Sequence, residues 1–186
     1  AVMQMICHGI STGALFILVG MIQERTGTRD LNLMGGLCNT IPRIGAVGLL
    51  FALASLGLPG LGNFVGEFLV LLGLYQAYPL MSVPAALGIV MAVIYSLRMV
   101  NRTFFGPLRQ PRAIQDMWPR ESALMSSLIL LIVWLGLFPQ SVLNIAKPSL
   151  KFIGEKSGVS LTQKPSWTNS LESLSKLQPA KNRHAK

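Results

Sequence analysis

The chain has 186 residues, of which 51% are apolar and only 12% are charged, about half the charged share of an ordinary soluble domain. This composition excludes a typical water-soluble globule and a disordered chain. The net charge of +9 does not indicate nucleic-acid binding, because the basic residues lie between apolar blocks and in the tail rather than along one basic element. The sequence instead predicts a membrane protein whose basic residues face lipid headgroups.

The first apolar segment, 1–22, contains no formal charge and is long enough to cross a bilayer as a helix. Its polar residues share one helical face at i, i+4, i+7 and i+8 spacing, namely Gln4, His8, Ser11 and Thr12. Such a stripe can hold a chain of waters, and an imidazole can pass protons between its two nitrogens. The alternative is a histidine that only hydrogen-bonds a neighbouring helix, and the residues leave both open.

A polar connection over 23–43 follows the first span. Four charged residues in it are expected to form a solvated or interfacial ion cluster, namely Glu24, Arg25, Arg29 and Asp30. The pair Gly35-Gly36 predicts a turn.

The second apolar segment, 44–78, is too long for one straight span. Its 35 residues would reach about 52 Å as a helix, against a hydrocarbon core of about 30 Å. The run 57–62, Gly-Leu-Pro-Gly-Leu-Gly, predicts a break, because proline lacks a backbone donor and glycine loosens the chain. Discontinuous helices are typical of transporters near their ion sites; a packing kink is the alternative.

Glu67 is the only charged residue between Arg43 and Arg98. A carboxylate in such a stretch is costly unless it is protonated, paired or near water, so Glu67 is the main candidate for a proton relay. A structural carboxylate paired with a basic residue of another helix is the alternative. Asn63 lies one turn earlier on the same face, and Pro59 and Gly60 in the predicted break support the same site.

Small residues recur at helix-contact spacing in both segments. Gly62 and Gly66 form one GxxxG pair, and Gly9 and Gly13 form another. Such pairs let two helices approach closely, so both pairs are expected at helix contacts.

The third and fourth spans are predicted at 79–100 and 122–143, joined by an Arg-rich connection. The predicted organisation is a transmembrane region, 1–143, and a basic polar C-terminal tail, 144–186, with a short interfacial helix near 171–177. The fold class is therefore an all-α polytopic transmembrane helix bundle of about four spans, one of them discontinuous. The positive-inside rule puts the two Arg-rich connections on the cytoplasmic or matrix side.

Metal or nucleotide chemistry is not indicated. Cys7 and Cys38 are isolated, and the sequence has neither CxxC nor HExxH, which excludes the usual zinc and iron–sulfur patterns. We expect no cofactor and no metal in this chain.

Several stretches resemble the C-terminal part of the antiporter-like proton-pumping subunits of respiratory complex I, NADH:quinone oxidoreductase. They are 3–18, 24–30, 35–37, 54–68, 95–98 and 104–106, and the similarity runs to about residue 143. The resemblance implies the last four helices of a fourteen-helix antiporter-like fold. Because the family's membrane lysines lie upstream, and Lys147 is the first lysine here, it also implies that an N-terminal part of the same subunit is missing.

The family resemblance also implies the roles of individual residues. The histidine matching His8 lies on the family's central hydrophilic axis, and the glutamate matching Glu67 ends its exit half-channel. NADH, FMN, iron–sulfur clusters and quinone are handled by other subunits of the complex. The implied partners are neighbouring antiporter-like membrane subunits and the lipid bilayer. The implied location is the bacterial inner membrane, with the mitochondrial inner membrane as the alternative.

Two other functions remain possible from the sequence. One is a subunit of a multi-subunit sodium/proton antiporter or a membrane-bound hydrogenase, which would share the fold and the glutamate helix. The other is a structural or assembly element without transport. Co-purifying subunits would distinguish the first, and a substitution of Glu67 that disturbs assembly but not pumping would indicate the second.

Overall fold

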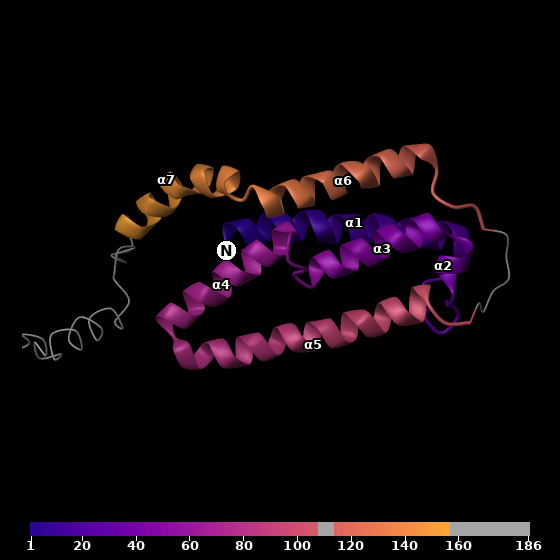
Figure 1. Cartoon of the computed structure of the whole chain (residues 1–186), viewed down its shortest axis with the longest axis horizontal. Helices are drawn as coiled ribbons and strands as arrows, with labels where there is room; N and C mark the ends of the chain where they lie inside the picture. Colours follow the sequence, from indigo (N-terminus) through magenta and orange to yellow (C-terminus); the bar gives the residue numbers. More distant parts are fainter. Residues whose placement is uncertain (108–113, 157–186) are drawn as a thin grey trace, which may run out of the picture. The chain divides into compact units, whose positions relative to one another are not determined.

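The structure, a computed structural model, describes residues 1–107 and 114–156. These residues fold only into helices and connecting turns (Figure 1). The helices are α1 (Val2–Thr26), α2 (Leu37–Thr40), α3 (Pro42–Ser55), α4 (Gly62–Ala77), α5 (Pro79–Phe104), α6 (Pro119–Leu137) and α7 (Gln140–Lys156). The predicted all-α class is confirmed. Residues 1–145 form one compact unit, and the description below concerns that unit.

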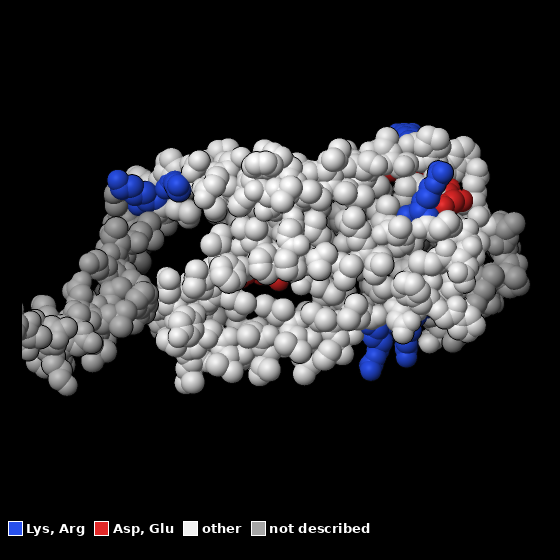
Figure 2. All heavy atoms as spheres, viewed as in Figure 1, with Lys and Arg blue, Asp and Glu red and all other residues white. Residues whose placement is uncertain are grey.

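Helix α1 lies at the centre of this unit, in contact with α3, α4 and α6 (Figure 1). The core is aliphatic and aromatic, and its fully buried members include Ala14, Ile41, Ile44, Phe51 and Ile132. Three helices are long and apolar enough to cross a membrane, α1, α5 and α6, and α3 is a shorter apolar helix. In Figure 2 basic side chains gather where α5 ends and α6 begins, and the long middle of the unit is almost free of charge.

The predicted break in the second apolar segment is present. Helix α3 ends at Ser55 and α4 begins at Gly62, so residues 56–61 form an irregular connection. Gly57 and Gly60 have φ values of +69° and +96°, respectively, and glycine is the residue that adopts such positive values readily. Helix α6 packs closely on this connection, because a Cβ at Gly136 would collide with the carbonyl oxygen of Gly60.

The end of the last predicted span differs from the structure. We expected one helix over 122–143, but α6 ends at Leu137 and a new helix, α7, begins at Gln140. The cause is Pro139, which disfavours helical geometry at the preceding residue and has no N–H to offer. Helix α7 also enters the predicted polar tail, and the helix predicted near 171–177 lies outside the described residues.

Of the four charged residues predicted to form a solvated or interfacial cluster in the first connection, Glu24, Arg29 and Asp30 are exposed, whereas Arg25 makes a longer-range contact. Arg25 pairs with Glu121 at the start of α6 at 2.6 Å, and its Nε donates to the carbonyl oxygen of Gln115 at 2.8 Å. The Nε of Arg29 donates to Gln23 at 2.5 Å. Arg25 therefore joins the end of α1 to the start of α6, a pairing that sequence spacing does not reveal.

Asp116 caps the first turn of α3 from a distant part of the chain. Its carboxylate accepts hydrogen bonds from the backbone N–H groups of Arg43 at 3.0 Å and Ile44 at 3.3 Å. Burial opposes ionisation of this carboxyl, but these hydrogen bonds, one from Met117 and the charge of Arg43 outweigh it and lower the pKa of Asp116 below 3.8. The ionised form is therefore the one that stabilises the start of α3.

The Asp116→Ala variant is expected to lose about 1 kcal/mol of stability at neutral pH, the usual effect of removing a helix cap. Because the folded-state pKa is depressed, this contribution is present above the unfolded pKa and disappears as pH falls through the lower folded value. The difference in thermal unfolding midpoint between wild type and variant, measured in detergent, should therefore shrink below about pH 4. Glu24→Ala, which removes an exposed carboxylate, is the control variant. A difference in midpoint between wild type and Asp116→Ala that is equally large at low and neutral pH would contradict the prediction.

Candidate functional site

The polar stripe of α1 divides into an inner and an outer edge. At about 100° per residue, Ser11 lies about 20° to one side of Gln4, and His8 and Thr12 lie about 40° and 80° to the other side. Ser11 is fully buried and Gln4 is half-buried, and both contact α4. His8 is exposed in this chain, and its ring nitrogens lie 3.3 and 3.4 Å from Oγ1 of Thr12.

Asn63, at the start of α4, joins α1 to the broken helix. Its Nδ2 donates to Oγ of Ser11 at 2.9 Å and to the carbonyl oxygen of Ala54 at 2.8 Å. Ala54 lies in the last turn of α3, and its carbonyl oxygen also accepts a hydrogen bond from the backbone N–H of Gly57 at 3.1 Å. A side chain from one half of the broken helix thus supplies a second hydrogen-bond partner for the backbone of the other half.

Glu67 lies one turn further along α4 and is half-buried. Its Oε1 accepts a hydrogen bond from Nε2 of Gln4 at 3.4 Å. On its other side the carboxylate packs against Gly57, because a Cβ built there would collide with Oε2 of Glu67. The carboxylate is therefore held between the inner edge of α1 and the break in the helix.

Gly62 and Gly66 form a close helix contact, as their spacing predicts. A Cβ at Gly62 would lie 2.6 Å from Sγ of Cys7, and one at Gly66 would lie 2.8 Å from Cα of Gln4. The approach of the two backbones at Gly66 brings Gln4 within reach of Glu67. Gly9 and Gly13 make no such contact with the described residues, because a Cβ at either would meet nothing within 4 Å.

Three buried polar atoms of this region have no hydrogen-bond partner among the described residues: Oε1 of Gln4, Oγ of Ser55 and Oδ1 of Asn63. They come from α1, α3 and α4. A buried polar atom without a partner costs about 1–3 kcal/mol, and in proteins ordered water is a common partner. The three atoms therefore give the surroundings of Glu67 unused hydrogen-bonding capacity.

Pro59 and Gly60 lie in the connection 56–61 and shape the break, and both are exposed. Gly57 and Ser55 also belong to the surroundings of Glu67, although the sequence does not identify them as site residues. The glycine-rich run indicated flexibility at Gly57, but its contact with Glu67 depends on how the chain returns after the break. For Ser55 no signal distinguishes it from other serines in apolar helices.

Removing the Asn63 amide should loosen the break. The Asn63→Leu variant is expected to lose about 2 kcal/mol, because Oγ of Ser11 and the Ala54 carbonyl oxygen each lose a buried hydrogen bond. The midpoint of thermal unfolding in detergent measures this, and Asn39→Leu, at an exposed amide on α2, is the control. Equal midpoints for the two variants would show that the Asn63 hydrogen bonds contribute nothing to stability.

No group of three or more His, Cys, Asp or Glu side chains that could hold a metal ion occurs in the part of the chain that the structure describes. The chemical capacity of the site thus rests on one carboxylate, an imidazole on the adjacent edge of α1, and neutral hydrogen-bonding groups. Such a set can accept, hold and release protons.

Comparison with known proteins gives consistent matches. Residues 1–94 match the family described as NADH:quinone oxidoreductase/Mrp antiporter, transmembrane region. The chain is 46% identical over 161 residues to NADH-quinone oxidoreductase subunit M of Pseudomonas aeruginosa, covering 87% of this chain and 32% of that protein. It is 43% identical over 153 residues to the subunit of the same name in Escherichia coli K12, covering 81% of this chain and 30% of the relative.

A solved structure matches as well. A chain in respiratory complex I from Thermus thermophilus with bound NADH superimposes with a TM-score of 0.66 and 36% sequence identity, over 70% of this chain and 28% of that one. The present chain thus spans about a third of the length of the curated relatives it matches.

Proposed function

This chain belongs to the NADH:quinone oxidoreductase/Mrp antiporter family of membrane proteins, and on that premise we propose that it forms part of subunit M of a bacterial NADH:quinone oxidoreductase. In this role it lies in the inner membrane among the other membrane subunits of the complex. It carries protons across the membrane while electrons pass from NADH to quinone elsewhere in the complex. The similarity to NADH-quinone oxidoreductase subunit M of Pseudomonas aeruginosa and of Escherichia coli supports this assignment.

One observation supports proton transfer above the others: Glu67 is held at a broken helix by Gln4 on one side and Gly57 on the other. A single carboxylate in a charge-free apolar segment is costly to keep without a function. Its position beside irregular backbone agrees with the sites where transporters bind ions. We assign Glu67 the role of proton acceptor and donor.

The remaining residues have different tasks in this proposal. His8 is the second relay group, and Thr12 orients its ring. Gln4 positions the Glu67 carboxylate, since an amide does not exchange a proton at neutral pH. Asn63 and Ser11 hold the two half-helices in register, and Pro59 and Gly60 keep the helix open. Because no direct hydrogen bond joins His8 to Glu67 in the part of the chain that the structure describes, the proton crosses between them through water.

The chain itself would perform no redox chemistry. NADH oxidation and quinone reduction would belong to other subunits, and this chain would contribute the membrane path for protons. The two alternatives are a sodium/proton antiporter subunit, which the family description includes, and a structural element without transport.

Purification of the full-length subunit from native membranes tests the assignment. An affinity tag on the subunit should recover a complex that oxidises NADH with added quinone and that, in vesicles, acidifies one side during turnover. Recovery of an assembly without NADH oxidation but with sodium-dependent proton exchange would assign the chain to an antiporter. A complex in which Glu67 is substituted and which still oxidises NADH and pumps protons normally would support the structural alternative.

A further inference from the structure

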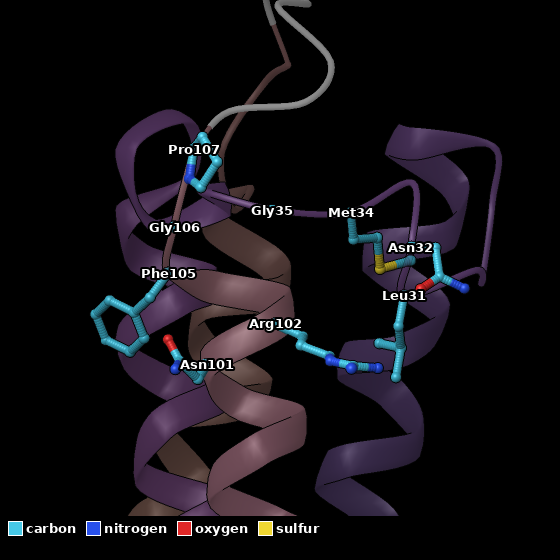
Figure 3. Close-up of a pocket in the computed structure, with 9 residues that line it drawn as sticks. All are labelled: Leu31, Asn32, Met34, Gly35, Asn101, Arg102, Phe105, Gly106 and Pro107. Carbon is cyan, nitrogen blue, oxygen red and sulfur yellow. The ribbon is translucent and has the colours of Figure 1, made fainter.

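A second region of interest lies at the end of the unit where α5 ends, away from Glu67. A cavity of about 230 Å³ opens between the loop 27–36 and the C-terminal turn of α5. Its polar lining comes from Asn32, Asn101 and Arg102, and its apolar lining includes Leu31 and Met34 (Figure 3). This volume exceeds the roughly 30 Å³ that one water molecule occupies in the liquid, so the cavity can hold a polyatomic group.

An apolar crevice of about 110 Å³ adjoins this cavity, and the two share Leu31 and Met34. The crevice lies between α1, α3 and α5, and apolar side chains from Leu15 to Ile22 line it on α1. At 1.5 Å per residue, these seven steps extend about 10 Å along the helix. The crevice is therefore long enough to take several methylene groups of an extended hydrocarbon chain.

The charge at this junction is positive. Arg102 is exposed and has no ion pair or hydrogen bond to another described residue, and its side chain extends across the cavity toward Leu31 (Figure 3). Arg29 lines the crevice. The nearby carboxylate of Asp30 accepts a hydrogen bond from the backbone N–H of Asn32 at 2.8 Å, so it is engaged with its own loop. Guanidinium groups in this setting favour phosphate, which they bind in a bidentate manner.

We propose that this junction binds a phospholipid with an anionic headgroup. Its phosphate lies in the cavity against Arg102, with Arg29 adding to the positive potential, and one acyl chain lies in the crevice between α1 and α5. A soluble anion would use only the cavity, and an apolar molecule would use only the crevice. The joining of a basic cavity to an apolar crevice at a helix end favours a ligand with both parts, and basic pockets between membrane helices are recognised sites for lipid headgroups.

Photolabelling of the intact complex tests this site. The complex is reconstituted in phosphatidylethanolamine vesicles that contain phosphatidylglycerol with a photoactivatable diazirine on its acyl chain, and labelled peptides are mapped by mass spectrometry. We expect label on the peptides around 15–22 and 99–105. Arg102→Gln should lower this labelling about fivefold, the change in binding expected when one arginine near an anionic surface is lost. Val19→Trp should also lower the labelling, because the larger side chain fills the crevice.

Arg98→Gln is the matched control. Arg98 lies one turn earlier on the same helix and lines neither cavity, so the substitution removes the same charge and should leave labelling unchanged. Native gels verify that each variant assembles. The proposal is overturned if these peptides label no more than other helices of the subunit, if Arg102→Gln and Arg98→Gln behave alike, or if upstream segments of the same subunit cross-link into the crevice. Loss of label on adding inorganic phosphate would assign the cavity to a soluble anion.

Discussion

The Glu67→Gln variant is expected to leave the complex assembled and to reduce proton-coupled NADH:quinone turnover by roughly a hundredfold, the lower range for loss of a positioned proton-transfer group. The substitution is close to isosteric and keeps an oxygen for the hydrogen bond from Gln4. It removes only the ability to bind and release a proton. A structural role would survive this change, whereas a relay would not.

Turnover and dye-detected acidification of native vesicles measure this effect, and a native gel confirms assembly. Glu24→Gln, at an exposed position near the end of α1, makes the same chemical change outside the site and should be neutral. Glu67→Asp should retain more activity than Glu67→Gln, because it keeps a titratable carboxyl. Unchanged pumping in Glu67→Gln would remove Glu67 from the proton path.

The second large effect concerns Gly66. Gly66→Ala should destabilise the subunit strongly, by roughly 2–3 kcal/mol, the upper part of the usual range for overpacking a close-packed interior. The new methyl would meet the backbone of Gln4 at 2.8 Å from its Cα and 2.9 Å from its N, and backbone atoms cannot turn aside as a flexible side chain can. The separation of α1 and α4 would also draw Gln4 away from Glu67.

Gly73→Ala supplies a matched control on the same helix. A Cβ at Gly73 would meet nothing within 4 Å among the described residues, so the variant should be neutral or slightly stabilising through its higher helix propensity. Thermal unfolding midpoints in detergent compare the two. If both alanine variants unfold at the same temperature, the close packing at Gly66 does not contribute to the stability of the subunit.

The sequence predicts the helices well because their signals are local. The charge-free stretch around Glu67 and the Gly-Leu-Pro-Gly-Leu-Gly run at 57–62 are enough to place a broken helix, because the apolar segment is too long for one straight span. The spacing of Gln4, His8, Ser11 and Thr12 likewise fixes their common face. The predicted end of the fourth span, residue 143, differs from the observed end of α6 at Leu137. Pro139 does not settle this end from sequence, since a proline in an apolar run indicates either a kink or an end.

The partners of these residues could not be predicted in the same way. That Gln4 meets Glu67 and Ser11 meets Asn63 depends on how closely α1 and α4 approach and on their relative rotation. That Arg25 pairs with Glu121, and that Asp116 caps α3, depends on the path of connections whose polar residues have many possible neighbours. Periodicity assigns a residue to a face, but it does not choose between the helices that the face can meet.

The two hydrogen bonds of the Asn63 amide bear on which part of this segment can move. Bending the chain at 56–61 would separate Asn63 from the Ala54 carbonyl oxygen or from Ser11 and so break a buried hydrogen bond. The contact between Gln4 and Glu67 is far looser, at 3.4 Å, beyond the usual length of such a bond. We therefore expect the Glu67 side chain to rotate about its own bonds more readily than the connection 56–61 bends. Such rotations take picoseconds to nanoseconds, against microseconds or longer for hinge motions, so the proton transfer proposed for Glu67 does not depend on a motion of the backbone.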